Sequence, residues 1–149
     1  MLNIIINAHK ANPIKVRSNS KCISADVTAG YDSNFPDVFE KSNSSIVSYG
    51  LAMNKFTGAR GKSGASDASC ECVGYFRNLF NSKNIVWQTG ELGKIDLGGG
   101  GTVAKYFANY NVDTVDLGVP VISMHSPYGL ISKVDLFNAY KGFKAFLDD

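Results

Sequence analysis

The chain has 149 residues, of which 44% are hydrophobic and 19% are charged, and its formal net charge is +2. This length and composition predict a single globular domain and exclude a disordered chain. The 15 Lys and Arg residues are scattered among 13 acidic ones, so we expect no nucleic-acid partner, because phosphate binding needs a basic stripe. Residues 2–8 are too few to span a membrane and follow no basic segment. We therefore expect no membrane partner, no signal peptide and a cytoplasmic location.

The N-terminal third predicts one helix, two strands and a long loop. Residues 2–10 predict a short amphipathic helix that ends at Asn12-Pro13, because the residue before a proline avoids the helical conformation. Residues 21–28 predict a strand, and 46–56 predict a second one. Residues 29–45 are rich in Gly, Ser, Asn, Asp and Pro and predict a loop. A loop of this length inside a compact domain is usually functional.

The middle of the chain predicts a turn, a helix and a strand. Residues 57–64 predict a glycine-rich turn, and either Ser66 or Asp67 can N-cap a helix that runs to about Phe80. Residues 85–89 then predict a short strand.

The C-terminal third continues the alternation of strands and helices. Residues 98–110 predict a helix opened by four glycines, and 112–116 and 119–124 predict two short apolar strands. Ser132 is placed to cap a final helix over 133–147. The whole pattern predicts an α/β fold with helices on a mixed sheet.

Three cysteines, Cys22, Cys70 and Cys72, make an odd number in a chain with enough residues for a hydrophobic core. This argues against a disulfide framework. We expect all three to be reduced, buried and chemically inert.

Two glycine-containing segments allow more than one interpretation. The run 98–101 before a helix offers free backbone N–H groups to a phosphate, carboxylate or developing oxyanion. It can equally be a loop that passes close to another backbone. The segment 58–63 ends like a phosphate-binding loop, but Phe56 stands where the first glycine should be. Arg60 and Lys62 are then expected to form a solvated basic loop.

Two residues of metal-binding type each follow a short apolar run: Asp26 and His125. An imidazole and a carboxylate at strand ends indicate metal or acid/base chemistry. Taken singly, His125 is more often a hydrogen-bonded structural residue, and Asp26 is more often a turn or capping residue.

Several short sequence motifs, taken in their order along the chain, favour a functional role for Asp26 and His125. They are Ser24-Ala25-Asp26-Val27, Met53-Asn54-Lys55, Gly90-Glu91-Leu92-Gly93-Lys94-Ile95-Asp96 with the glycine run, Asp116-Leu117-Gly118 and Ser123-Met124-His125-Ser126. By the residues of these motifs and their order, the chain from about residue 20 to 147 resembles the aspartyl aminopeptidase family, and its bacterial branch in particular.

The resemblance implies a two-zinc exopeptidase with a catalytic domain of the phosphorylase/hydrolase-like fold, in which metal-bound water attacks the N-terminal peptide bond. Asp26 would be a ligand of one zinc and His125 a ligand of the other. Lys55 would lie near the pocket for the substrate side chain, and Gly100, Gly101 and Thr102 would line the substrate site. The resemblance makes peptides the substrates and acidic N-terminal residues a plausible preference.

The chain also departs from the family pattern. The family's His-x-Asp segment, bridging Asp, Glu-Glu pair with the general base, and dimerisation domain have no counterpart in it. We expect residues 1–149 to be the C-terminal portion of a metallo-aminopeptidase catalytic domain, with weak zinc binding and very low activity alone. Exposed strand edges predict a homo-oligomer or a complementing chain.

Two other functions compete with this interpretation. The chain could be a non-catalytic α/β module that binds an anion or serves assembly, or, on the strength of 61–63 and the glycine run, a nucleotide-binding protein. The peptidase interpretation requires that Asp26 and His125 converge on one rim of a single sheet, a few ångströms apart.

Overall fold

The computed structural model describes residues 2–59, 63–94, 96, 97 and 99–149. Within this part of the chain, no helix has the length and apolar character needed to cross a bilayer. The described elements form a mixed α/β arrangement, as predicted.

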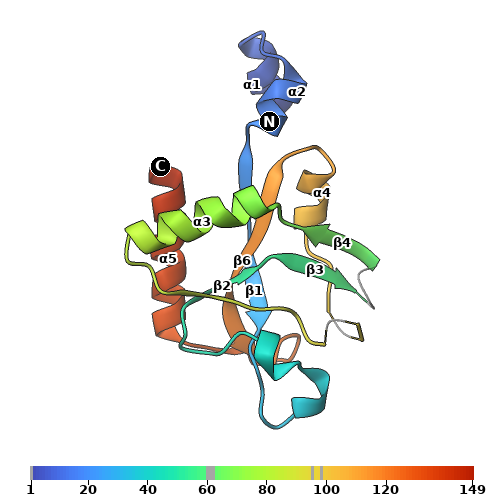
Figure 1. The fold of residues 1–149 in the computed structure, drawn as a ribbon, viewed down its shortest axis with the longest axis vertical. Helices are drawn as coiled ribbons and strands as arrows, with labels where there is room; N and C mark the ends of the chain where they lie inside the picture. Colours follow the sequence, from blue (N-terminus) through green and yellow to red (C-terminus); the bar gives the residue numbers. More distant parts are fainter. Residues whose placement is uncertain (1, 60–62, 95, 98) are drawn as a thin grey trace.

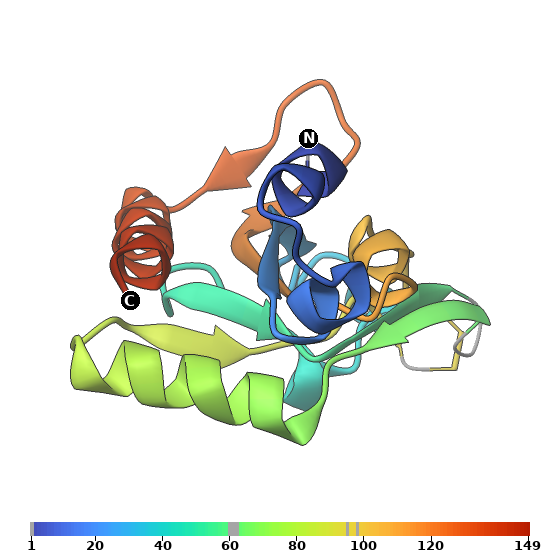
Figure 2. The same ribbon diagram turned by 90° about the horizontal axis from the view of Figure 1, so that it is seen from above.

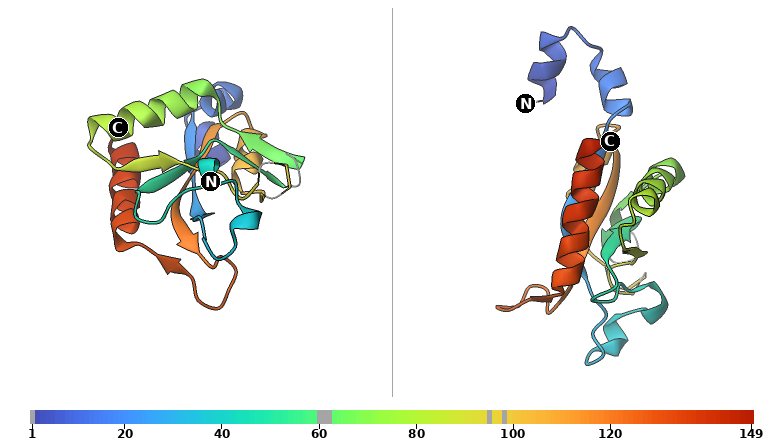
Figure 3. Two further views of the ribbon diagram at one scale, coloured as in Figure 1. Left: turned by 60° about the horizontal axis from the view of Figure 1, so that its bottom comes forward. Right: turned by 90° about the vertical axis from the view of Figure 1, so that its left-hand side faces the viewer.

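Two short helices, α1 (Leu2–Ala8) and α2 (Pro13–Ser18), project from one end of the molecule (Figures 1 and 3). The predicted first helix is confirmed, but Asn12-Pro13 starts a second helix as well as ending the first. The Asn12 Oδ1 accepts hydrogen bonds from the amides of Ile14 (2.9 Å) and Lys15 (3.2 Å). Proline at the first helical position loses no intrahelical hydrogen bond, so the pair is a good helix start.

The main sheet has the strand order β1-β6-β2-β5. Strand β1 (Lys21–Ala29) runs parallel to β6 (Asp113–Ile122), and β6 runs antiparallel to β2 (Leu51–Asn54). Strand β5 (Trp87–Thr89) is parallel to β2, and the short β7 (Leu130–Ile131) pairs with the end of β6. The sheet is therefore mixed, as the sequence predicts.

The two strands predicted at 112–116 and 119–124 are one continuous strand, β6. Gly118 does not break it, and Pro120 is tolerated because β2 pairs only with Asp116–Gly118. Proline has no N–H to donate, so it is accepted where a ladder hydrogen bond on that side is not needed.

The predicted strand 46–56 and turn 57–64 are both wrong in their bounds. Ser48 has φ +75° and Gly50 has φ +97°. These left-handed conformations are incompatible with a strand, so the strand begins only at Leu51. A hairpin of β3 (Phe56–Ala59) and β4 (Ser63–Asp67) then occupies most of the predicted turn.

The helix after this hairpin is α3 (Cys70–Ser82), and Ser69 caps it by accepting the amide of Cys72 at 3.1 Å. The expected caps, Ser66 and Asp67, lie in β4 instead. The pairing of β4 with β3 holds these two residues in an extended conformation, so the helix begins only after Asp67.

The core lies between the sheet and the helices α3 and α5 (Lys133–Asp148), which also contact each other (Figure 2). Phe76 and Phe80 of α3 are fully buried against Leu51 and Leu117 of the sheet. The predicted cap of α5 is confirmed, since the Ser132 hydroxyl accepts the amide of Val134.

The cysteines only partly match their prediction. All three are free, as expected. Cys72 is fully buried, and burial raises the pKa of its thiol to about 11. Cys70, however, is exposed, because the first turn of α3 faces solvent at that position.

Candidate metal and substrate site

Asp26 lies within β1 and is level with Gly118 of β6. Its side chain is exposed, and its Oδ1 accepts the amide of Val27 at 2.7 Å. The second carboxylate oxygen appears in no described hydrogen bond. An exposed carboxylate in this position is chemically suitable as a metal ligand.

His125 lies in the turn that follows β6. Ser123 (φ +63°) and His125 (φ +64°) both adopt the left-handed conformation, and the amide of Ser126 donates to the Ser123 carbonyl at 3.1 Å. Such conformations are uncommon for residues other than glycine, and they concentrate at functional sites. The His125 side chain is exposed.

The two expected ligands come from adjacent parallel strands, but they are not level with each other. Asp26 is level with Gly118, and His125 lies beyond the C-terminal end of β6 at Ile122. The strand between Gly118 and Ile122 covers about 13 Å. The register therefore places Asp26 and the C-terminal end of β6 at different levels of the sheet, and the turn at 123–126 sets the position of the His125 side chain.

A narrow hollow beside Asp26 brings together residues from five separate parts of the chain. Its polar lining residues are Asp26, Thr28, Asn54, Thr102 and Asp116. The Thr102 hydroxyl donates to Asp116 Oδ2 at 2.9 Å, and the Asn54 amide donates to the Thr28 hydroxyl at 2.9 Å. Of the residues expected in the site, the structure thus groups Asp26 with Thr102.

Asp116 is an acidic residue in this hollow that was not predicted as a site residue. It is only 7% exposed, and its Oδ1 has no hydrogen-bond partner within the described part of the chain. Burial raises its pKa above the ordinary 3.8, and the Asp26 carboxylate adds to the rise, whereas neighbouring hydroxyl groups lower it. The sequence did contain a signal for Asp116, namely an acidic residue among apolar ones on a predicted buried strand. A buried carboxyl group needs hydrogen-bonding partners, so other polar residues were to be expected around it.

Lys55 does not line this hollow, although the preceding residue, Asn54, does. It follows Asn54, which pairs with Asp116, so Lys55 is level with the first half of β6 and away from the turn containing His125. Its ammonium group forms a salt bridge with Asp67 of β4, and this hydrogen bond raises the pKa of Lys55.

The glycine run does not open a long helix. Helix α4 (Ala104–Ala108) has five residues, and Val103 precedes it without a side-chain cap. Gly100 is half-buried and Gly101 is exposed, and neither lines the hollow beside Asp26. The short helix α4, which begins after Val103 and not at the glycine run, gives the anion-binding alternative less support than the predicted long helix.

The backbone near the run supports the alternative of a close passage. At Gly99 (φ +93°), an added Cβ would lie 2.2 Å from the Gly58 carbonyl oxygen. Gly61, Lys62 and Gly98, on which the nucleotide-binding interpretation partly rests, lie outside the described residues, as does Arg60 of the predicted basic loop.

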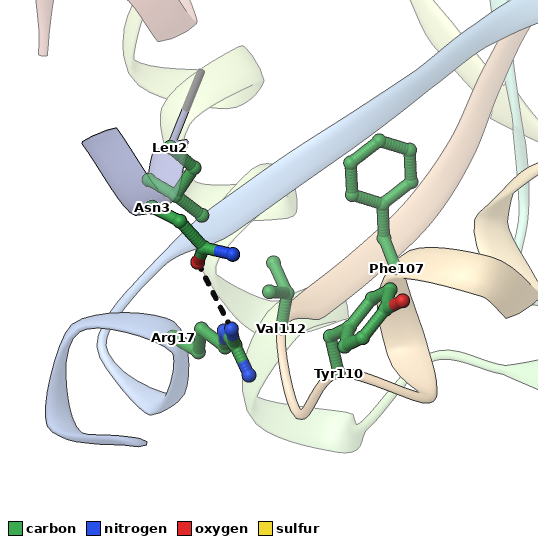
Figure 4. Close-up of a pocket in the computed structure, with 6 residues that line it drawn as sticks. All are labelled: Leu2, Asn3, Arg17, Phe107, Tyr110 and Val112. Carbon is green, nitrogen blue, oxygen red and sulfur yellow. Dashed lines mark hydrogen bonds between the residues drawn. The ribbon is translucent and has the colours of Figure 1, made fainter. Parts of the chain in front are cut away.

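A larger hollow lies between the N-terminal helices and the segment joining α4 to β6 (Figure 4). Its lining includes Leu2, Phe107 and Tyr110, and the Arg17 guanidinium donates to Asn3 at 3.1 Å beside it. It contains none of the expected site residues.

The donor types fit zinc, but the set is incomplete. Carboxylate oxygen and imidazole nitrogen are ordinary zinc ligands, and structural or catalytic sites use three or four protein ligands. The described residues contain no group of three or more His, Cys, Asp and Glu side chains that could hold a metal ion.

Comparison with known proteins identifies the family. Residues 2–147 match the family described as aminopeptidase I zinc metalloprotease (M18). An M18 family aminopeptidase 1 from Borreliella burgdorferi is 52% identical over 128 residues, which are 86% of this chain and 28% of the relative. A relative from Thermotoga neapolitana is 41% identical over 97% of this chain and 31% of its own length.

Solved structures give the same result. The M18 aminopeptidase of Thermotoga maritima matches with a TM-score of 0.92 at 38% identity, over 98% of this chain and 34% of that chain. Aminopeptidase I from Clostridium acetobutylicum matches with a TM-score of 0.86 at 43% identity, over 91% of this chain and 30% of that chain. The chain thus spans about a third or less of the proteins it matches. From the family match and these relatives, we conclude that the chain belongs to the M18 family of aminopeptidases.

Proposed function

We propose that this chain is the C-terminal portion of the catalytic domain of a zinc-dependent aminopeptidase, which removes N-terminal residues from peptides. The observation that carries the proposal is the exposure of Asp26 on β1 and of His125 in the turn that follows β6, the parallel neighbour of β1, in an M18 chain. Ligands commonly bind beyond the carboxyl ends of parallel strands.

In this proposal, Asp26 holds one zinc ion and His125 holds the other. Bound zinc supplies an acidified water and polarises the peptide carbonyl group. Around Asp26, the hydrogen-bonded group of Asp116, Thr102 and Thr57 fixes the β6 and α4 side of the site. Such outer contacts orient metal ligands and tune them.

The proposed catalysis needs residues in addition to those of this chain. Two ligands cannot complete two zinc sites, and the Glu-Glu pair expected to hold the general base has no counterpart in the sequence. We infer that activity requires the remainder of the catalytic domain, supplied by another part of a longer protein or by a complementing chain.

Self-association is part of the proposal. One similar structure, of the yeast protein mApe1, is described as a dodecamer. In this chain, helix α5 exposes Val134, Phe137 and Tyr140 to solvent. Contiguous exposed apolar residues are typical of association surfaces. Sedimentation velocity over a concentration series tests whether the chain assembles.

Zinc titration by calorimetry tests the metal ligands. Asp26→Ala and His125→Ala should each weaken zinc binding by about tenfold or more, since each removes one of few ligands. Asp37→Ala and His9→Ala change the same residue types at exposed positions outside the proposed site, and they should leave binding unchanged. Equal behaviour of all four variants would contradict the proposed ligands.

A further inference from the structure

Three buried polar residues stand level with one another on three neighbouring strands, which Figure 1 shows at the centre of the molecule. The register places Ser24 of β1 beside Asp116 of β6, and Asp116 opposite Asn54 of β2. Ser24 is 4% exposed, Asn54 3% and Asp116 7%. Asn54 and Asp116 line one hollow, and the Ser24 hydroxyl is close enough to Asp116 to lower its pKa. The three side chains therefore form one polar row across a single face of the sheet, since paired strands lie only about 4.8 Å apart.

Each residue of this row has one buried oxygen that finds no hydrogen-bond partner among the described residues. These oxygens are Ser24 Oγ, Asn54 Oδ1 and Asp116 Oδ1. The other polar atoms of Asn54 and Asp116 are engaged, because the Asn54 amide donates to the Thr28 hydroxyl and Asp116 Oδ2 accepts the Thr102 hydroxyl, each at 2.9 Å. Buried polar atoms in native proteins nearly always have a partner. Three such oxygens in one row therefore indicate a bound particle.

The size and chemistry of the hollow limit what this particle can be. Its volume is about 10 Å³, which is the room that one water molecule or one small ion needs. Asn54 Oδ1 and ionised Asp116 Oδ1 are both acceptors, so they cannot hydrogen-bond to each other. The particle between them must carry positive charge or donate protons, which excludes an anion and an apolar group.

The charge of the row favours a cation over water. None of the described residues that line the hollow is basic, and the described hydrogen-bond partners of Asp116 are the neutral hydroxyls of Thr57 and Thr102. Burial raises the pKa of Asp116 in spite of these hydroxyls, so they compensate its charge only in part. A buried carboxylate without a positive partner is strongly destabilising. Water would supply the missing hydrogen bonds but leave the charge, whereas a cation neutralises it as well.

The donor set fits a hard, monovalent cation. All three donors are oxygens, which suit hard cations, and only the carboxylate carries a formal charge, so one positive charge gives neutrality. Mg²⁺ usually keeps several waters, for which the hollow has no room, and Ca²⁺ takes about six to eight oxygens. Sodium is close to calcium in size and carries half its charge.

We propose that Ser24, Asn54 and Asp116 bind one sodium ion through these three oxygens. The ion neutralises the buried carboxylate and connects β1, β6 and β2 at one level of the sheet. The proposal goes beyond the peptidase function and does not depend on it, because the proposed zinc ligands Asp26 and His125 are not among the three residues.

Sodium binding is tested by the stability of the full chain in different salts. Urea unfolding is measured at pH 7.5 in about 0.2 M sodium, potassium or choline chloride, with a sodium-free chelator present. A ligand that binds only the folded chain raises its stability with concentration. We expect the folding equilibrium constant to be about tenfold larger in sodium than in choline, which corresponds to a dissociation constant of about 20 mM, and less than threefold larger in potassium. Equal constants in the three salts would overturn the proposal and leave water as the particle.

Two serine variants separate the row from general salt effects. Ser24→Ala removes one proposed ligand without breaking a described hydrogen bond. Its stability in choline should change little, and its gain in sodium should fall below threefold. Ser66→Ala is the matched control, because Ser66 is also a buried strand serine, 8% exposed, but lies in β4 outside the row. It should keep the tenfold gain, and a full gain in Ser24→Ala would contradict the proposed ligands.

Asp116→Asn keeps the shape of the side chain and removes its negative charge, so the gain in sodium should disappear. Sodium-23 NMR gives a second measurement without urea. The wild-type chain should broaden the sodium resonance, and Asp116→Asn and Ser24→Ala should broaden it much less. If Asp116→Asn does not fold, Ser24→Ala decides the result alone. Broadening of the same size in the wild type and in every folded variant would place the bound sodium elsewhere and overturn the proposal.

Discussion

The Thr102 hydroxyl donates a 2.9 Å hydrogen bond to Oδ2 of Asp116, which is 7% exposed. This bond links the segment after the glycine run to the strand that leads to His125. Thr102→Val keeps the side-chain shape but removes the donor, so the unfolding free energy should fall by about 1–3 kcal/mol. Urea denaturation measures this loss.

The control for Thr102 is Thr89, which is exposed at the end of β5. Thr89→Val should change the unfolding free energy by less than about 0.5 kcal/mol, as surface substitutions usually do. Losses of equal size in the two variants would show that the bond to Asp116 contributes nothing specific.

The buried carboxyl of Asp116 should make stability depend on pH. Burial raises its folded-state pKa above the ordinary 3.8, so the folded protein holds this proton more tightly than the unfolded chain does. The resulting stabilisation is complete below pH 3.8 and is lost as the pH rises through the folded-state pKa.

Asp116→Asn removes this titration. The unfolding free energy of the wild-type chain minus that of the variant should decrease as the pH rises from 3.8 toward neutrality, in urea titrations at constant ionic strength. The exposed Asp37→Asn should show no such trend. A difference between wild type and Asp116→Asn that increases with pH would mean that the folded-state pKa is lowered rather than raised.

Gly118 allows close approach of β6 to β1 beside Asp26. An added Cβ would lie 2.4 Å from the Asp26 carbonyl oxygen, so Gly118→Ala must displace backbone. We expect a loss of about 3 kcal/mol in unfolding free energy, at the upper end of the usual cost of overpacking, and weaker zinc binding.

Gly74 is the matched control, since it lies in α3 with nothing within 4 Å of an added Cβ. Gly74→Ala should raise the unfolding free energy by roughly 0.5–1 kcal/mol, because alanine is the better helix former. A tolerated Gly118→Ala would refute the close contact between the two strands.

The three thiols should react at very different rates. Cys70 is exposed, Cys22 is half-buried with its pKa raised by burial and by Asp116, and Cys72 is buried with a pKa of about 11. Because the thiolate is the reactive form, a thiol reagent at pH 8 should modify one cysteine rapidly. Cys70→Ser should abolish the rapid phase, whereas Cys22→Ser should not, and persistence of that phase in Cys70→Ser would contradict the assignment.

Sequence pattern succeeded where neighbouring residues decide the structure. The cap at Ser132 and the strand β1 follow from local hydrogen bonding and alternation. It failed where distant segments compete. The segment 57–64 contains turn-forming residues, yet pairing within the β3–β4 hairpin extends most of it. Gly118 and Pro120 suggested a break that β1 prevents by pairing along nearly the whole of β6.

The sequence by itself determined the motifs of the family, the candidate metal ligands Asp26 and His125, and the alternation of strands and helices. These features depend on residue identity and order. Only the tertiary structure decided which groups meet. Asp135 is fully buried, and its two carboxylate oxygens accept the amides of Ser48 at 2.6 Å and Gly50 at 2.7 Å. Those partners lie more than 80 positions away in the chain. Such a contact, like that of Thr102 with Asp116, exists because packing the core brings distant backbone and carboxylate groups together, where each must find a partner in the absence of water.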